Sequence, residues 1–358
     1  MKILRIGDLS IAVPVIQGGM GVGISLSGLA SAVAMEGGVG VISSAGLGLI
    51  YRHFSGNYLE ASIHGLKEEI RKAREKTIGV IGVNIMVAMS NFADMVRTAI
   101  QEKVDIIIAG AGLPLDLPSF LNKDSKTKLM PIVSSARAAR IICEKWKSGF
   151  DYLPDAVIVE GPEAGGHLGF REEQLKDSNY SLEHLVPEIR QELNLFEKKY
   201  NKTIPLIAAG GIYTGDDINR IMKLGASGVQ MATRFVTTNE CDAPNAFKQT
   251  YIDAEEKDIE IIKSPVGMPG RAIISGFLNK VKDGRKQPQK CPFKCIKTCD
   301  ISKSPYCIIV ALMNAFKGNF DNGFAFAGSN AFRATKISSV KEVFQSLIDE
   351  YRSSVNND

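Results

Sequence analysis

The sequence predicts an α/β protein in which eight parallel strands and their helices form a (β/α)8 barrel. Three observations lead to this fold class. Eight short apolar runs rich in β-branched residues recur up to residue 233, a Gly-rich or polar turn follows each run, and amphipathic segments with helical periodicity separate them. The runs are continuously apolar, as is typical of a parallel sheet that is covered on both faces. An open, doubly wound sheet with a similar number of strands is the alternative that periodicity leaves open.

The predicted strands follow one another at intervals that leave room for a helix between most of them. They cover residues 13–17, 39–44, 81–84, 105–110, 130–135, 156–161, 205–210 and 228–233.

End signals place three of the helices. The segment 25–38 begins with serines suited to N-capping and ends in Gly37 and Gly38. A second helix is expected to begin at Asn91. A third begins with Thr214 and first-turn acids and ends at Gly225.

The alternation stops after the eighth strand. Residues 239–322 contain the turn-rich stretch SPVGMPGR, the basic run KVKDGRKQPQK and four cysteines. The earlier pattern returns with GFAFAG and an amphipathic C-terminal helix. We therefore predict that residues 1–238 and 323–358 form the barrel and that residues 239–322 form a small inserted cap domain on the substrate side.

Composition and charge exclude several functional classes. The chain has 358 residues, of which 45% are hydrophobic, and a net charge of +4. It can bury a large core, and its charge is too weak to indicate nucleic acid or an anionic membrane as a partner. The sequence shows no apolar stretch of roughly 18 uncharged residues and no signal-peptide pattern at its N-terminus. We expect a cytoplasmic protein with neither nucleic acid nor membrane as partner.

The loops after the strands are the expected ligand site, because ligands of such barrels bind at the C-terminal ends of the strands. Loops after strands seven and eight often form a phosphate site. Side-chain amides at other strand ends suit the edge of a heterocycle. The sequence therefore predicts a mononucleotide across the barrel mouth. The candidate phosphate ligands are the backbone amides of Gly210, Gly211, Ala232 and Thr233, and the candidate side-chain amides are those of Gln17 and Asn84.

His167 is the candidate catalytic residue. Among the four histidines, it alone follows a strand end, through the pair Gly165 and Gly166. With an unperturbed pKa near 6.5, histidine can act as a base or a hydrogen-bond donor at neutral pH. Of the two nearby carboxylates, Glu163 could orient His167 or cap a turn, and Glu160 could be structural.

Six motifs in this order resemble those of the nitronate monooxygenase family, formerly called 2-nitropropane dioxygenases, which also contains FMN-dependent enoyl-ACP reductases. The resemblance covers roughly residues 1–238 and, more loosely, GFAFAG. It implies an FMN-binding TIM (β/α)8 barrel with a small second domain over the flavin. The motifs are PVIQGGMG, GVN, PIVSSARAAR, DAVIVEGPEAGGHLG, PLIAAGGI and GASGVQMATRF.

The resemblance also implies roles for individual residues. Gly18, Gly19 and Met20 would lie along the isoalloxazine ring, with Gln17 and Asn84 near the ring or the ribityl chain. Gly165 and Gly166 would line the flavin site, and the four candidate phosphate ligands would bind the phosphate. His167 would be the active-site histidine. The family usually has glycine where this chain has Ala232.

Two reactions are implied. The leading expectation is oxidation of alkyl nitronates with O₂ to a carbonyl compound and nitrite, with His167 holding the anion or taking the α-proton of a neutral nitroalkane. The alternative is reduction of an enoyl thioester with NAD(P)H as electron donor. A flavin-free phosphate-binding barrel and a non-catalytic FMN carrier are the other classes left open. The expected partners are a small-molecule substrate and O₂, with a homodimer as the candidate assembly.

Four cysteines lie within residues 291–307. On a helix, Cys291, Cys295 and Cys299 would share one face, and Cys307 follows. Four thiolates could hold zinc or an iron–sulfur cluster, but the spacing is not that of two separated zinc-ligand pairs. A redox or disulfide pair and simple packing thiols are the alternatives. We predict no metal, with these four as the metal-ligand candidates.

Overall fold

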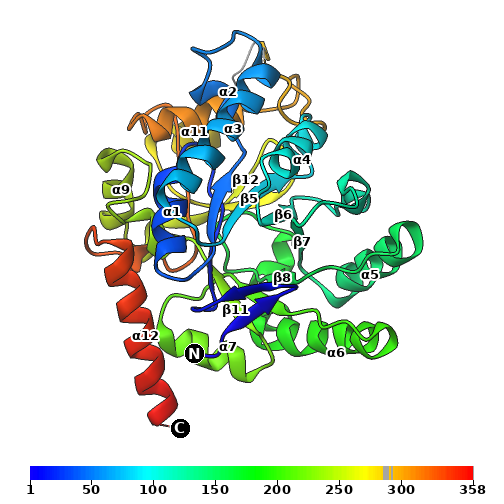
Figure 1. Cartoon of the computed structure of the whole chain (residues 1–358). Helices are drawn as coiled ribbons and strands as arrows, with labels where there is room; N and C mark the ends of the chain where they lie inside the picture. Colours follow the sequence, from blue (N-terminus) through cyan, green and yellow to red (C-terminus); the bar gives the residue numbers. More distant parts are fainter. Residues whose placement is uncertain (285–289, 292, 358) are drawn as a thin grey trace.

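A closed barrel of eight parallel strands forms the centre of the computed structural model, which describes residues 1–284, 290–291 and 293–357 (Figure 1). Part of the basic run 280–290 therefore lies outside the described residues. The strand order is β3-β11-β10-β8-β7-β6-β5-β4. A bridge between Ile16 and Val39 joins the two ends of this sheet. The TIM-barrel prediction is confirmed, and the open doubly wound sheet is wrong.

All eight predicted strands are present, with bounds that shift by a few residues. Helices follow most of them and pack around the outside (Figure 1). The strands are β3 (Val15–Gln17), β4 (Gly40–Ser43), β5 (Ile81–Met86), β6 (Ile106–Gly110), β7 (Lys128–Val133), β8 (Val157–Glu160), β10 (Leu206–Ala209) and β11 (Gly228–Met231). The helices are α1 (Ser27–Met35), α2 (Leu47–Ile50), α3 (Tyr58–Lys76), α4 (Phe92–Gln101), α5 (Ala136–Phe150), α6 (Leu182–Tyr200), α7 (Gly215–Lys223), α8 (Thr233–Val236) and α12 (Val340–Asn356).

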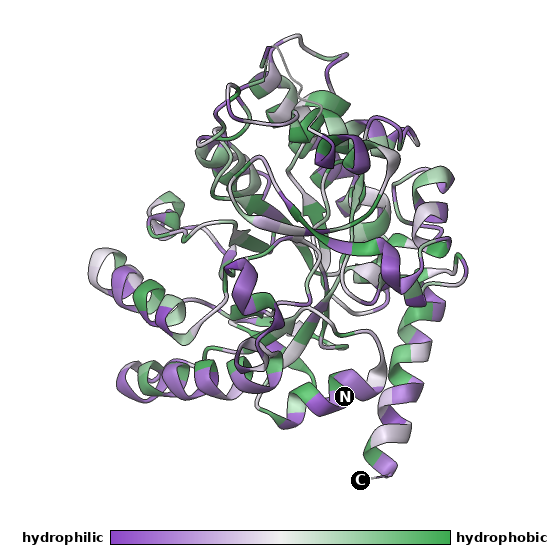
Figure 2. Ribbon diagram, turned by 180° about the vertical axis from the view of Figure 1, so that it is seen from behind, coloured by the Kyte–Doolittle hydropathy of each residue, from purple (hydrophilic) through white to green (hydrophobic). Residues whose placement is uncertain are grey.

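The strands are apolar throughout because both of their faces are buried. On β8, Ile158 packs into the barrel interior, whereas Val157 and Val159 pack under the surrounding helices. Figure 2 shows the same arrangement as hydrophobic strands at the centre and helices that are hydrophilic on their outer sides. Each fully buried isoleucine or valine contributes roughly 1.5–3 kcal/mol relative to an exposed one.

A hairpin that the sequence did not predict closes the N-terminal end of the barrel. It consists of β1 (Leu4–Ile6) and β2 (Leu9–Ile11), which pair antiparallel. Its buried side chains pack onto interior residues of the barrel, and Asp8 forms an ion pair of 2.6 Å with Lys128 at the start of β7. Ligands must therefore enter from the opposite end, where the strands finish.

The helix starts show where local signals succeed and where they fail. Thr214 caps α7 as predicted, since its hydroxyl accepts from the Asp217 N–H at 3.2 Å. The predicted serine cap of α1 is wrong. The carboxylate of Asp242 accepts instead from the N–H groups of Leu26, Gly28 and Leu29 at 2.7–3.1 Å. A residue that is distant in sequence thus satisfies these donors.

A second, antiparallel sheet covers the open end of the barrel. Strand β13 (Pro269–Ile273) pairs with β12 (Ile259–Lys263) on one side and with β14 (Ala325–Phe326) and β9 (Gly166–His167) on the other. The sheet of the 239–322 segment thus takes in two strands from outside that range. The described part of the segment also contains the helices α9 (Asn245–Ile252), α10 (Gly276–Lys282) and α11 (Ile308–Phe316).

The 239–322 segment, which is called the cap below, also packs against the first helices of the barrel. In Figure 1, α11 (orange) lies beside α2. Ile309 of α11 belongs to an apolar cluster with Val22, against which Leu49 of α2 and Tyr58 of α3 pack. Within the described residues, no helix is long and apolar enough to cross a membrane.

Candidate active site at the mouth of the barrel

A cavity of about 280 Å³ lies at the C-terminal ends of the barrel strands, under the cap sheet. It brings together residues from six of the strand-end loops and from residues 325–328. Among the site residues predicted from the sequence, those that line it are Gly18, Gly19, Met20, Asn84, Gly165, Gly166, His167, Gly210, Gly211, Ala232 and Thr233.

Gln17 is the predicted site residue that the structure does not bring into this cavity. Its side chain is fully buried, and its amide nitrogen donates to the Gly18 carbonyl. Its amide oxygen accepts from the Val41 N–H at 2.9 Å. Gln17 therefore stabilises the junction between β3 and β4, where the barrel closes.

The loop after β3 forms a wall of the cavity that is lined by glycines. The Met20 N–H donates to the Ser25 hydroxyl at 2.7 Å, which fixes the course of the loop. A Cβ at Gly19 would overlap the side chain of Asn84, so only glycine fits there. At Gly18, an added Cβ would lie 3.2 Å from the Ala232 methyl group. Glycine at position 18 thus leaves room for the alanine that departs from the family pattern.

The loops after β10 and β11 present free backbone donors to the cavity. Gly210 and Gly211 adopt φ values of +98° and +76°, which favour glycine. In the part of the chain that the structure describes, the N–H groups of Gly210, Gly211, Ala232 and Thr233 donate to no protein acceptor. All four residues are partly buried and line the cavity, so their N–H groups are available to ligand oxygens. Together with the glycine-lined wall, which carries no bulky side chain at positions 18 and 19, they fit the phosphate and the planar ring of a mononucleotide such as FMN.

His167 occupies β9, between the barrel loop and the cap. Its Nε2 lies 2.8 Å from the Ser264 hydroxyl oxygen, and its ring meets Phe326 edge to face at 5.0 Å. Burial lowers the pKa of His167 to about 4. The imidazole is therefore neutral at pH 7, and its other ring nitrogen has no partner among the described residues.

Arg271 of β13 holds the loop that carries His167. Its Nη1 donates to the carbonyl oxygens of Pro162 and Ala164 at 2.6 and 2.7 Å. Burial lowers the pKa of this guanidinium, which still stays protonated at pH 7. This side chain thus ties the turn between β8 and β9 to the cap sheet.

Glu163 does not orient His167. Its backbone carbonyl accepts from the Ser329 N–H at 3.1 Å, and its carboxylate accepts from the Ser329 hydroxyl at 3.3 Å. Beside it, the Asn330 amide donates to the Gly211 carbonyl at 2.7 Å. Glu163 and Asn330 therefore connect the loop 327–330 to the loops after β8 and β10.

Glu160, the last residue of β8, lies where the first cavity meets a second one of about 410 Å³. Burial raises the pKa of its carboxyl to about 7. The two cavities share His167, Glu160 and three other residues. The remaining wall of the second cavity is largely apolar and includes Leu113, Val266 and Met268.

Sequence reasoning missed Ser264 and Arg271 as members of this site. Both belong to SPVGMPGR, which was recognisable only as a turn-rich stretch. Their contacts depend on the pairing of β13 with β9, which joins residues more than 100 positions apart. A lone arginine within a glycine-rich turn is a weak signal that could have drawn attention to Arg271.

The four clustered cysteines lie in a segment of turns, at unequal depths below the surface. Among the described residues, no three His, Cys, Asp or Glu side chains gather in a way that could hold a metal. The segment contains turns and a bridge from Ile296 to Met89 rather than the helix that would align the thiols. All six cysteines are free thiols; Cys295 is buried and Cys299 is exposed. Burial raises the pKa of Cys295 to about 12.

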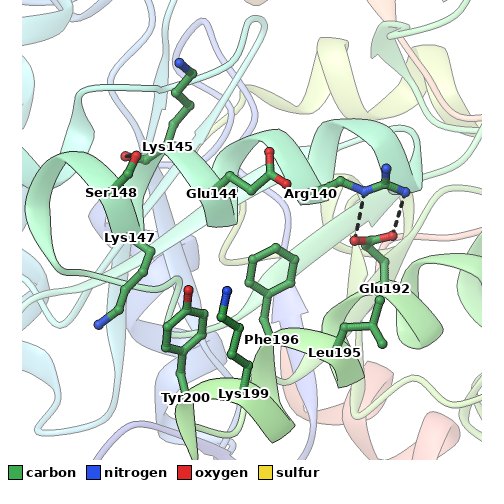
Figure 3. Close-up of a pocket in the computed structure, with 10 residues that line it drawn as sticks. All are labelled: Arg140, Glu144, Lys145, Lys147, Ser148, Glu192, Leu195, Phe196, Lys199 and Tyr200. Carbon is green, nitrogen blue, oxygen red and sulfur yellow. Dashed lines mark hydrogen bonds and ion pairs between the residues drawn. The ribbon is translucent and has the colours of Figure 1, made fainter.

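A larger, open groove of about 840 Å³ lies between α5 and α6, on the outside of the barrel (Figure 3). The Arg140 guanidinium donates two hydrogen bonds to Glu192, at 2.9 and 3.0 Å. The other residues that line this groove include lysines and the rings of Phe196 and Tyr200. It contains no strand-end loop, so we place the chemistry at the barrel mouth.

Comparison with known proteins identifies related sequences over most of the chain. The family model described as nitronate monooxygenase matches residues 4–350. A probable nitronate monooxygenase of Bacillus subtilis is 24% identical over 371 residues, covering 95% of this chain and 96% of that protein. A (3aS,4S,5R,7aS)-5-hydroxy-7a-methyl-1-oxo-octahydro-1H-indene-4-carboxyl-CoA dehydrogenase of Mycobacterium tuberculosis is 28% identical over 273 residues. That match covers 76% of this chain and 66% of the relative, just under two thirds of its length.

Solved structures show the same architecture. FabK from Thermotoga maritima superposes with a TM-score of 0.75 and 27% identity, covering 97% of this chain and 95% of that one. A nitroalkane oxidase from Streptomyces ansochromogenes has a TM-score of 0.71 at 20% identity, covering 97% and 98% of the two chains. The second likeness supports the fold alone.

Proposed function

The chain belongs to the nitronate monooxygenase family and is an FMN-dependent oxidoreductase, and we propose that it oxidises alkyl nitronates with O₂ to a carbonyl compound and nitrite. The observation that carries this proposal is a neutral histidine beside a glycine-lined cradle of free backbone donors. Such a site suits a small anionic substrate next to a planar cofactor.

FMN is the proposed cofactor, and particular residues are suited to hold it. Gly210, Gly211, Ala232 and Thr233 would donate their N–H groups to the phosphate. The wall of Gly18, Gly19 and Met20 would face the ring, with Asn84 at its edge. When bound, FMN would supply the redox chemistry by which the substrate carbon is oxidised and O₂ is reduced.

His167 is the proposed group that meets the substrate. A neutral imidazole can donate one hydrogen bond to a nitronate oxygen or accept the α-proton of a neutral nitroalkane. Ser264 holds the ring in place, and the apolar edge contact with Phe326 limits access of water to it. These contacts favour a fixed and dry position for the proton-handling nitrogen.

Assays with propyl 2-nitronate test the proposal. We expect O₂ uptake and nitrite release without NADH. In H167A, kcat/KM should be roughly 10²- to 10⁴-fold lower, the usual contribution of a positioned acid or base. Absence of O₂ uptake, together with rapid NAD(P)H oxidation that depends on a crotonyl thioester, would contradict the proposal.

The second candidate function is NAD(P)H-dependent reduction of an enoyl thioester. The observation that favours it is the 410 Å³ cavity beyond His167, whose apolar wall could receive an acyl chain. In this case, His167 would meet the thioester carbonyl. The crotonyl-thioester assay above separates the two functions.

A further inference from the structure

Neither proposed role of His167 uses the carboxyl group of Glu160, which lines the cavity beside it. Its backbone pairs with Ala209 of β10 at the barrel rim, and its side chain lines both cavities beside His167. It makes no hydrogen bond and no ion pair with any described residue. A largely enclosed carboxyl that faces a cavity and has no partner in the protein is available to a ligand.

The walls around Glu160 contain no compensating cation. Among the residues that line the two cavities, the titratable groups are Glu160, Glu163, His167 and Tyr251, and none is a lysine or an arginine. Met86 of β5, Ala111 after β6 and Ile132 of β7 are the neighbours that line both cavities with it, and all are uncharged. Arg271 of β13, which holds the loop after β8, already donates to two carbonyl oxygens.

This charge distribution creates a problem for an anionic substrate. An ionised Glu160 in a poorly solvated cavity would repel a nitronate, and no lysine or arginine lines the walls to offset that repulsion. A neutral Glu160 would instead offer an O–H donor. Hydrogen bonds from such a group to an anion are short and strong.

We propose that Glu160 binds the substrate in its protonated form and donates its carboxyl O–H to the anionic oxygen of the nitronate. Binding of the anion is thereby coupled to retention of one proton on Glu160. This inference deepens the proposed function and rests on it for the identity of the anion. The proton stays on Glu160, so the step is a hydrogen bond and not a transfer.

The expected pH dependence follows from the burial of this group. Because burial raises the pKa of Glu160 to about 7, the donor form predominates below pH 7 and is lost above it. Each pH unit above this pKa should therefore weaken anion binding about tenfold. His167 is neutral throughout this range and adds no slope of its own.

Isobutyrate, a non-reactive carboxylate with the shape of 2-propyl nitronate, tests the inference by calorimetry. Using the FMN-loaded protein between pH 6 and 9, we expect the Kd of the wild type to rise about tenfold per pH unit above pH 7. In buffers of different ionisation enthalpy, the wild type should take up close to one proton per bound anion at pH 8. E160Q, whose amide donates at every pH, should bind with a flat profile and without proton uptake.

A matched control and a separate readout distinguish failure of the Glu160 proposal from failure of the proposed nitronate oxidation. E144Q changes a carboxylate in the outer groove between α5 and α6, away from the barrel mouth, and should keep the wild-type slope. Proton uptake is measured on the wild type itself, so the test does not depend on the folding of E160Q. A flat wild-type profile, equal slopes in E160Q and wild type, or no isobutyrate binding at pH 6 would overturn the role of Glu160. Proton-coupled binding without nitronate turnover would instead support Glu160 as an anion donor while the proposed function fails.

Discussion

The Nε2 atom of His167 and the hydroxyl oxygen of Ser264 lie 2.8 Å apart, and this hydrogen bond joins the barrel loop to the cap. His167 also belongs to β9, which pairs with β13 of the cap sheet. The orientation of the imidazole therefore depends on the 239–322 segment as well as on the barrel. Disturbing either partner should change catalysis without removing a group of the proposed phosphate site.

Removal of the Ser264 hydroxyl should impair His167. One neutral hydrogen bond contributes about 0.5–1.5 kcal/mol, so S264A should lower kcat/KM for propyl 2-nitronate by roughly 2- to 10-fold. FMN content should stay at the wild-type level, because Ser264 is not among the residues that line the FMN cavity. S62A, at another buried serine on α3, is the matched control and should keep wild-type kinetics. Equal kcat/KM values for S264A and wild type would show that the contact does not position the ring.

Arg271 should be needed to keep the turn between β8 and β9 in place. Hydrogen bonds from charged groups contribute about 1.5–3 kcal/mol each, so R271M should lower the urea midpoint of unfolding and speed amide exchange in residues 162–168. The comparison variant is R97M, at a surface arginine whose ion pair with Asp94 spans 3.7 Å. Its stability should change by less than about 0.5 kcal/mol. Unchanged exchange in residues 162–168 of R271M would contradict the assignment.

The strand ends predicted much of the cavity because one topological rule places all C-terminal strand ends together. That rule needs only the order of the apolar runs, which were visible because both strand faces are buried. Gln17 shows the limit of the rule. It lies at a strand end as predicted, but its amide faces Val41 and closes the barrel junction instead of facing the cavity.

The cap sheet could not be predicted in the same way. Strand β9 has two residues and pairs with β13 about 100 residues later, so no local window contains both partners. The N-terminal cap of helix α1 could not be predicted for the same reason, because the distant Asp242 accepts its hydrogen bonds instead of the nearby serines. Contacts between distant segments also decide that Ser264 approaches His167 and that the side chain of Glu160 is left unpaired.

Gly211 should be required for FMN binding. Its φ of +76° is unfavourable for alanine, and a Cβ would overlap the Glu163 carboxylate. Purified G211A should therefore contain little FMN, and its Kd for added FMN should rise at least about tenfold, equivalent to about 1.4 kcal/mol. G284A tests the backbone effect alone, because Gly284 has a φ of +81° with no neighbouring atom within 4 Å. Full FMN loading of G211A would contradict the proposed phosphate site.

Thiol reactivity should follow burial. Cys299 is exposed and should react quickly with Ellman's reagent, whereas Cys143, Cys241 and Cys295 are buried. Burial raises the pKa of each of these three thiols to about 12, so they should react only after unfolding. C299S should lose the fast phase. If the four clustered thiols instead became reactive together on addition of a chelator, they would hold a metal after all.

His167 and Glu160 should make opposite contributions to the pH dependence of stability. The pKa of His167 falls from 6.5 to about 4 on folding, so its contribution is lost as the pH drops below 6.5 and the unfolded chain takes up the proton. The pKa of Glu160 rises from 4.5 to about 7, so its contribution is lost as the pH rises above 4.5. Each slope reaches up to about 1.4 kcal/mol per pH unit, and between pH 4.5 and 6.5 the two cancel in the wild type.

Variants at the two positions should separate these slopes. Relative to the wild type, E160Q should lose stability as the pH falls from 6.5 to 4.5, because only the His167 term remains. H167Q should lose stability as the pH rises over the same interval, because only the Glu160 term remains. Urea unfolding at fixed FMN concentration measures both differences, and E144Q in the outer groove is the control that should follow the wild type. If the free energies of unfolding of the wild type, E160Q, H167Q and E144Q changed with pH in parallel, the pKa values of His167 and Glu160 would not shift on folding as described above.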